Sequence, residues 1–201
     1  MHIVVKADQQ QKQEFLSRSI PSAIQISWME NDLIDADVYF DLQFEEIGSS
    51  FNQIDQKPVF VNAVVATCKE LPVNYIRINA WNGFLMRPLI EVAAGNDFYK
   101  EEGSKILTAL GWDFQFVVDE PGMIAARIIS MIINEAYFAL GEKVSSKEEI
   151  DIAMKLGTNY PYGPFEWSEK IGLQMIYDLL KRLHEQDEHY SIAPMLINEL
   201  N

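Results

Sequence analysis

Several residue types that build common functional sites are scarce in this sequence. Its single cysteine, Cys68, excludes an intramolecular disulfide, and its three histidines, His2, His184 and His189, have no metal-ligand spacing. No apolar run approaches the ~20 residues that a membrane span requires. The first residues also lack the basic and apolar regions of a signal peptide. These absences predict a cytoplasmic protein with no metal site and no membrane segment.

Positive charge is also in short supply. The 201 residues contain 16 Lys and Arg against 30 Asp and Glu, which gives a formal net charge of -14. An acidic surface repels the phosphates of nucleic acids and of anionic lipids. We therefore expect neither nucleic acid nor a membrane surface as a partner. The 48% hydrophobic content is enough for a sizeable core.

The first 120 residues alternate short apolar runs with polar stretches. The apolar runs predict strands, and the stretches rich in helix formers predict helices between them. This alternation is typical of a doubly wound, mainly parallel sheet. Two of the connections are short, so we expect a truncated Rossmann-like sheet. The predicted strands are 2–7, 23–29, 36–44, 58–64, 75–80 and 112–119, and the predicted helices are 9–19 and 98–111.

From Pro121 onward the pattern is helical. Apolar residues recur at helical spacing over 122–140, a capping box at Ser145–Glu148 or Ser146–Glu149 starts a helix that ends at Gly157, and Pro164 suits the first turn of another. A further amphipathic stretch follows at 173–185. The sequence therefore predicts an α/β domain over 1–120 and an all-helical domain over 121–201.

The turn after the first strand has no glycine. A dinucleotide-binding turn needs glycines so that the backbone and a helix N-terminus can approach a pyrophosphate. Here the turn reads "VVKADQQQKQ", in which Asp8 suits an N-cap and would repel phosphates. Glu30 is the one candidate for the acid that binds a ribose, and Phe15 and Trp28 are candidates to fill the vacant space. We therefore predict no cofactor-binding residues and no bound cofactor.

The segment 119–173 resembles the 3-hydroxyacyl-CoA dehydrogenases, above all in "EEIDIAMKLGTNYPYGPFEW". The resemblance extends more weakly back to about residue 58. It implies a helical C-terminal domain that helps to close the substrate cleft and forms a homodimer. The aromatic residues of the corner "LGTNYPYGPFEW" are expected to pack in a core or interface. These are Tyr160, Tyr162, Phe165 and Trp167.

The family passes hydride from the 3-hydroxyl of an acyl-CoA to NAD, with a His base oriented by a Glu and with a Ser and an Asn nearby. Laid on this pattern, "INAWNGFLMRPLIEV" places Glu91 on the Glu, Asn82 on the Asn of Asn-Pro, and Asn79 on the catalytic His. Val64 falls on the Ser, and Ala126 falls on a further Asn of the first C-terminal helix. Asparagine accepts no proton at neutral pH, so general-base catalysis at Asn79 is lost.

The resemblance and these altered positions lead to three interpretations. The first is a catalytically degenerate family member, a pseudoenzyme with a structural or regulatory role or one that binds an acyl or other small ligand. The short acidic link "ENDLIDA" (30–36), where the family has a coenzyme A-binding helical region, agrees with it. The second is an active NAD-dependent 3-hydroxyacyl-CoA (3-hydroxybutyryl-CoA) dehydrogenase with an atypical site. The third is a different activity with Glu91 as acid or base.

Overall fold

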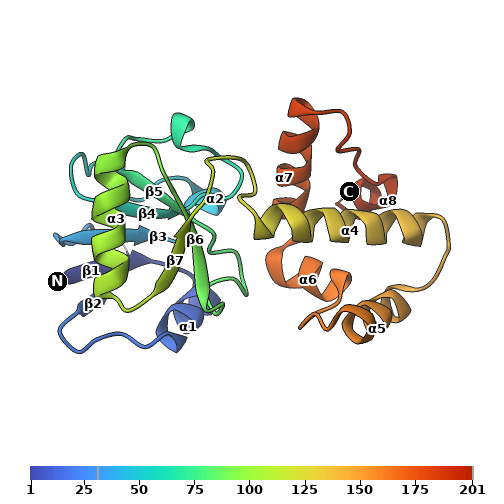
Figure 1. Cartoon of the computed structure of the whole chain (residues 1–201), viewed down its shortest axis with the longest axis horizontal. Helices are drawn as coiled ribbons and strands as arrows, with labels where there is room; N and C mark the ends of the chain where they lie inside the picture. Colours follow the sequence, from blue (N-terminus) through green and yellow to red (C-terminus); the bar gives the residue numbers. More distant parts are fainter. Residues whose placement is uncertain (31, 201) are drawn as a thin grey trace. The chain divides into compact units, whose positions relative to one another are not determined.

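The computed structural model describes residues 1–30 and 32–200 and divides the chain into two compact units, Met1–Met123 and Ile124–Asn201 (Figure 1). The first unit is α/β and the second is helical, in agreement with the predicted fold class.

The first unit is built on a seven-stranded sheet with the strand order β2-β1-β3-β4-β5-β6-β7. Every neighbouring pair is parallel except β5 and β6, which are antiparallel. The strand order reverses between β1 and β3, which is where open α/β sheets place their ligands. The strands are β1 (His2–Lys6), β2 (Gln25–Trp28), β3 (Val38–Asp41), β4 (Val59–Asn62), β5 (Tyr75–Ile78), β6 (Leu89–Ala94) and β7 (Asp113–Phe116).

Over residues 1–30 and 32–123, three helices and one 3-10 turn connect these strands. They are α1 (Gln9–Ser17), α2 (Phe44–Ile47), the turn η1 (Cys68–Glu70) and α3 (Asp97–Ala109). Phe15 of α1 and Leu107 of α3 are buried in the core on one face of the sheet, which Figure 1 shows with α3 lying across it. A second core on the other face contains Tyr39, Phe51 and Val61.

Two local predictions for this unit were wrong. The strand expected over 36–44 stops at Asp41, and Phe44 begins the short helix α2. The strand β6 was not predicted at all, although "LIEVAA" is apolar, because it contains the carboxyl of Glu91. The antiparallel β6 lies between β5 and β7 and adds a seventh strand to the six that were predicted.

The buried guanidinium of Arg77 joins the end of β4 to the segment after β7. It is fully buried, donates to the carbonyls of Ala63 and Val64 at 2.9 and 3.1 Å, and forms a 2.5 Å ion pair with Asp119. A buried charge persists only when it is paired and hydrogen-bonded. Arg77 is therefore a structural residue of this unit.

The second unit consists of α4 (Ala125–Gly141), α5 (Lys147–Thr158), α6 (Pro164–Ile171), α7 (Leu173–Gln186) and α8 (Pro194–Leu200). The long helix α4 contacts α6, α7 and α8. Of the two predicted capping boxes, the structure forms the one between Ser146 and Glu149. The helix α5 ends at Thr158 rather than Gly157, because Asn159 takes the left-handed conformation of the cap, with φ of 55°.

The corner between α5 and α6 depends on a close approach of the two helices. Asp151 of α5 accepts hydrogen bonds from the amides of Phe165 and Glu166 at 2.8 and 3.2 Å, which satisfies the N-terminus of α6. A Cβ on Gly163 would lie 2.5 Å from the Cα of Asp151, so only glycine fits there. Of the four corner aromatics, Phe165 and Trp167 are buried, whereas Tyr160 is exposed.

Candidate functional site

Asn79 and Glu91 lie side by side at the carboxyl edge of β5. The amide of Asn79 donates to the carbonyl of Glu91 at 3.3 Å, and its Nδ2 donates to the Glu91 carboxylate at a long 3.5 Å. Both residues are buried, at 3% and 8% exposure. Because the carboxylate takes the Nδ2 side of the amide, the Oδ1 of Asn79 is left buried with no hydrogen-bond partner among the described residues.

The loop after β5 carries Asn82, whose Oδ1 is likewise buried without a partner in the described part of the chain. The next residue, Gly83, has φ of 94°, a conformation that favours glycine. Its amide donates to both carboxylate oxygens of Glu14 at 2.7 and 2.9 Å. Glu14 on α1 therefore fixes the loop that presents Asn82.

The remaining two predicted positions are apolar and fully buried. The carbonyl of Val64 accepts from Gly122 at 2.7 Å, but its side chain offers no hydroxyl. Ala126 lies on α4 in the second unit. Near Val64, Asn62 has a structural role, since its Oδ1 accepts from the Ala80 amide and its Nδ2 donates to the Leu42 carbonyl.

The N-terminus of α1 faces the point where the strand order reverses, and its own residues satisfy it. Asp8 accepts from the amide of Gln11 at 2.7 Å, and Gln11 Oε1 accepts from the amide of Asp8 at 2.9 Å. This reciprocal capping box uses two of the amides that a phosphate would need. The carboxylate of Asp8 also adds a negative charge. The turn therefore does not fit the pyrophosphate of NAD.

Gln11 also reaches across the edge of the sheet. Its Nε2 donates to the carbonyl of Leu42, after β3, at 2.8 Å, and the side chain is 1% exposed. Phe15 and Trp28, the candidates to fill this space, pack edge to face with ring centroids 5.9 Å apart, and Lys12 of α1 lies 4.6 Å from the Trp28 ring. Gln11 thus ties the first turn of α1 to the chain after β3.

Gln11 and Glu14 were missed by sequence reasoning, as was Arg18 farther along. Arg18 donates to the carbonyls of Leu85 and Arg87 at 2.8 and 2.7 Å. The three polar residues have the i, i+3, i+7 spacing of one helix face. This spacing could have predicted that one face of the helix carries polar side chains that bind other segments of the chain.

Burial dominates the electrostatics at the ends of β3 and β4. It raises the pKa of Asp41 to about 6 and that of Glu45 to about 7. Burial also raises the pKa of the Cys68 thiol to about 12, with further contributions from Asp119. Cys68 is therefore a poor nucleophile.

None of the three histidines belongs to the segments that carry Asp41, Glu45, Asn79 and Glu91. His2 Nε2 lies 2.9 Å from the Ser27 hydroxyl, His184 is in the last turn of α7, and His189 follows α7. Over residues 1–30 and 32–200, no group of three or more His, Cys, Asp or Glu could hold a metal ion. In the same ranges, no helix has the length and apolarity needed to cross a membrane.

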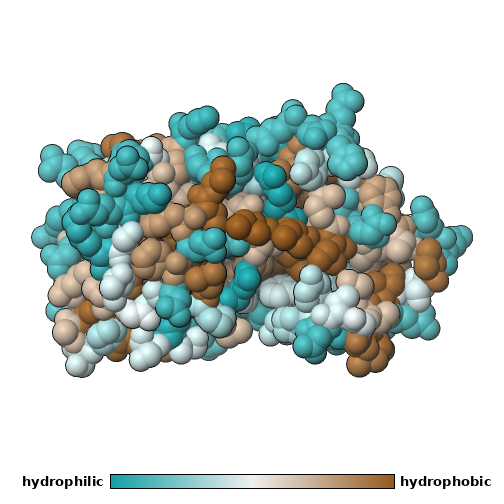
Figure 2. Space-filling view, viewed as in Figure 1, coloured by the Kyte–Doolittle hydropathy of each residue, from teal (hydrophilic) through white to brown (hydrophobic). Residues whose placement is uncertain are grey.

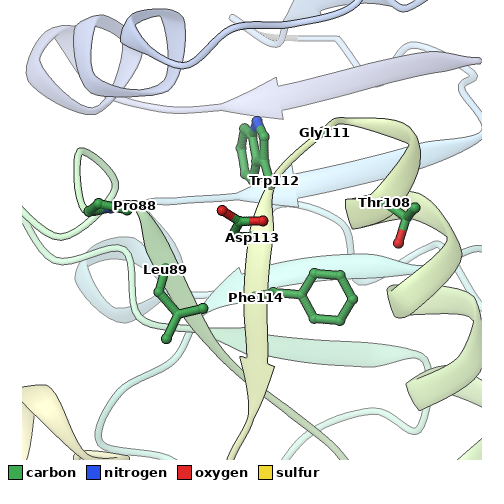
Figure 3. A pocket seen from close by; sticks show the side chains of 7 residues that line it. All are labelled: Pro88, Leu89, Thr108, Gly111, Trp112, Asp113 and Phe114. Carbon is green, nitrogen blue, oxygen red and sulfur yellow. The ribbon is translucent and has the colours of Figure 1, made fainter.

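A hollow of about 530 Å³ lies beside the edge strand β7 (Figure 3). Figure 3 shows Asp113 as the one charged side chain among those that line it, on a strand whose Phe114 ring points toward Thr108. None of the five predicted site residues lines this hollow. Its lining residues are Pro88, Leu89, Thr108, Gly111, Trp112, Asp113 and Phe114.

A mainly parallel sheet with a switch point is the architecture of dinucleotide-binding domains. The 3-hydroxyacyl-CoA dehydrogenase C-terminal domain matches residues 122–200. The (S)-3-hydroxybutyryl-CoA dehydrogenase of Ralstonia eutropha, at 20% identity, shares the fold with a TM-score of 0.71 over 98% of this chain and 92% of that one.

Two curated relatives are more similar in sequence. The 3-hydroxyadipyl-CoA dehydrogenase of Escherichia coli is 46% identical over 82 residues, which are 40% of this chain and 17% of that protein. The 3-hydroxybutyryl-CoA dehydrogenase of Bradyrhizobium diazoefficiens is 33% identical over 138 residues, 66% of this chain and 47% of that protein. The chain thus matches less than half the length of either relative. It belongs to the 3-hydroxyacyl-CoA dehydrogenase family.

Proposed function

We propose that this chain is a family member without NAD-dependent dehydrogenase activity, with a binding, regulatory or structural role. Asn79 carries the proposal, because the resemblance aligns it with the catalytic His and its side chain lies beside Glu91. Oxidation of a 3-hydroxyl requires a group that takes the hydroxyl proton as hydride leaves. The amide of Asn79 can accept a hydrogen bond from a hydroxyl but cannot take its proton.

The turn after β1, where the family binds the nucleotide, supports the same proposal. The capping box of Asp8 and Gln11 and the bond from Gln11 to Leu42 occupy the place of the glycine-rich turn. The link after β2 that replaces the coenzyme A region includes Asn31, which lies outside the described residues, and its other residues form no helix. A ligand of this protein would therefore be an acyl or other small molecule held without a dinucleotide.

We also propose a homodimer formed through the helical unit. Ile124, the N-cap of α4, and Ile128 of α4 are 48% and 53% exposed, and Ile132 on the same face is half-buried. Figure 2 shows a hydrophobic stripe that follows α4. An exposed apolar stripe along a helix is typical of an interface between subunits. A cytoplasmic location stays a prediction from the sequence.

A second candidate is an active 3-hydroxyacyl-CoA dehydrogenase with an atypical site. It is favoured by the names of the curated relatives and by the retained carboxyl of Glu91. Under this alternative NAD is the cofactor, and a residue other than Asn79 is the base.

Calorimetric titration with NADH, then with acetoacetyl-CoA, followed by NADH absorbance with both present, separates the two candidates. We expect no heat with NADH and no loss of absorbance, with a complete 3-hydroxybutyryl-CoA dehydrogenase as the positive control. Tight NADH binding with acetoacetyl-CoA-dependent turnover would overturn the first proposal. Sedimentation at increasing concentration tests the dimer, and a monomer throughout would contradict it.

A further inference from the structure

No residue of the short helix α2 is buried as a whole, although the carboxyl of Glu45 is enclosed against the carboxyl ends of the sheet strands. Phe44 packs partly against the second core, whereas Glu46 and Ile47 are exposed. The inward contacts of α2 beyond Phe44 come from the carboxyl of Glu45. Hydrogen bonds to this carboxyl therefore hold α2 against the sheet, whereas the longer helices are held there by apolar packing.

Glu45 joins α2 to the ends of two strands. Its Oε1 accepts from the amide of Val65, after β4, at 2.5 Å. Its Oε2 accepts from the indole Nε1 of Trp81, after β5, at 3.1 Å. One side chain thus holds α2 to the chain after β4 and to the chain after β5.

Asp41 holds the other end of the same segment. Its Oδ2 accepts from the amide of Ser50, just after α2, at 2.7 Å. Its Oδ1 is buried with no partner within residues 1–30 and 32–200, in a side chain that is fully buried. A carboxylate in such a place has lost its hydration without full replacement, so the site favours the protonated acid.

Few positive charges offset this cost. Lys6 at the end of β1 attracts Asp41, and Arg77 on β5 attracts Glu45, although Arg77 is already paired with Asp119. Partial burial raises the pKa of Glu46, and the negative charge of Asp8 before α1 adds to the rise. The charged and titratable groups that face the two carboxyls or their segment are therefore Lys6, Asp8, Glu46, Tyr75 and Arg77.

We propose that residues 43–50 form a pH-dependent cover over the carboxyl edge of β4 and β5, latched while Glu45 and Asp41 are protonated and released when they ionise. Opening hydrates the two carboxylates, so their ionised forms favour the open state. Gly48, with φ of 80° and open space around its Cα, provides a joint just after α2. Release uncovers the backbone next to Val65 and Trp81.

Hydrogen exchange measured by NMR tests the cover at the two donors that Glu45 binds. Between about pH 5.5 and about pH 8.5, we expect the protection of the Val65 amide and the Trp81 indole N–H to fall about tenfold after correction for intrinsic exchange. Glu45→Gln keeps one acceptor oxygen and cannot ionise, so its protection should be nearly constant over that range.

Glu46→Gln is the matched control, because it removes an exposed carboxyl from the same helix. It should keep the pH dependence of the unmodified chain. Equal protection at both pH values in the unmodified chain would overturn the proposal, as would an unchanged pH dependence in Glu45→Gln. The first of these results needs no variant, so the test stands even where Glu45→Gln fails to fold. It also needs no nucleotide, and is therefore independent of the proposed function.

Discussion

The side chain of Gln11 is bonded to the carbonyl of Leu42 at 2.8 Å, across the point where the strand order of the sheet reverses. In a dinucleotide-binding fold this place belongs to the ligand. Here a side chain of the protein occupies this place, and the helix that would face a pyrophosphate is hydrogen-bonded to the chain after β3.

This bond makes Gln11 a stability residue. Replacing Gln11 by Ala leaves the buried Leu42 carbonyl with one donor fewer and breaks the capping box, so we expect a loss of about 1–3 kcal/mol in the free energy of unfolding. Urea denaturation followed by circular dichroism measures it. Gln9→Ala, at an exposed position of the same helix, should change stability by less than about 0.5 kcal/mol. Equal effects from both variants would contradict the assignment.

Substituting His for Asn79 places an imidazole beside the Glu91 carboxylate. A nearby negative charge favours the protonated ring, so we expect its pKa to lie above the ordinary value of about 6.5. NMR titration of the ring protons reports this pKa directly. Adding Glu91→Gln should lower it, and no difference between the single and double variants would show that the two side chains do not interact. We expect no NADH oxidation from either variant.

The buried carboxyls make stability depend on pH. The pKa values of Asp41 and Glu45 are raised by burial to about 6 and about 7, above the values of about 4 in an unfolded chain. The folded chain therefore binds more protons between about pH 4 and about pH 7, and the contribution of these groups to stability falls as the pH rises through that window. The fall amounts to a few kcal/mol, at about 1.4 kcal/mol per pKa unit.

Urea midpoints measured across this window test the prediction. The double variant Asp41→Asn with Glu45→Gln should show a flatter pH profile than the unmodified chain. The pKa of Asp119 is shifted in the opposite direction through hydrogen bonds from Cys68 and Arg77, which outweigh its burial. Its contribution is common to both proteins and cancels in the comparison. A double variant with the same profile would be inconsistent with the burial of these carboxyls.

Two glycines in the corner sequence give a matched pair of substitutions. Gly163→Ala would force a methyl group against the backbone of Asp151, and we expect a loss of about 3 kcal/mol or more in the stability of the helical unit. Gly157→Ala meets no atom within 4 Å in helix α5, and we expect a gain of up to about 1 kcal/mol. Thermal denaturation of both variants checks the pair, and the reverse order would refute the close approach of α5 and α6.

Patterns in the sequence were sufficient for the regular parts of the fold. The β-branched run of β1, the capping box of Ser146 and Glu149, and Pro164 in the first turn of α6 each specify local structure with a mechanism of its own. The alignment that put Asn79 and Glu91 together also agrees with their contact at 3.5 Å. Whether they act on a ligand stays a prediction.

Contacts between distant segments were not predictable in the same way. Glu14 binds the amide of Gly83, 69 residues away, and a glutamate on a helix is ordinarily a solvated surface residue. The helix α2 is only four residues long, too short to show a helical period. The apolar run of β6 is interrupted by Glu91, whose burial depends on the neighbouring strand rather than on local sequence.

The polar stripe of α1 also bears on any attempt to rebuild a nucleotide site here. Two loops, those after β3 and β5, share this one helix as their anchor, through Gln11, Glu14 and Arg18. Grafting glycines into the first turn would remove Gln11 and disturb the register of the other two anchors. Point substitutions are therefore not enough to restore a dinucleotide site. We expect that restoration requires exchange of the whole β1–α1 segment together with the loops after β3 and β5.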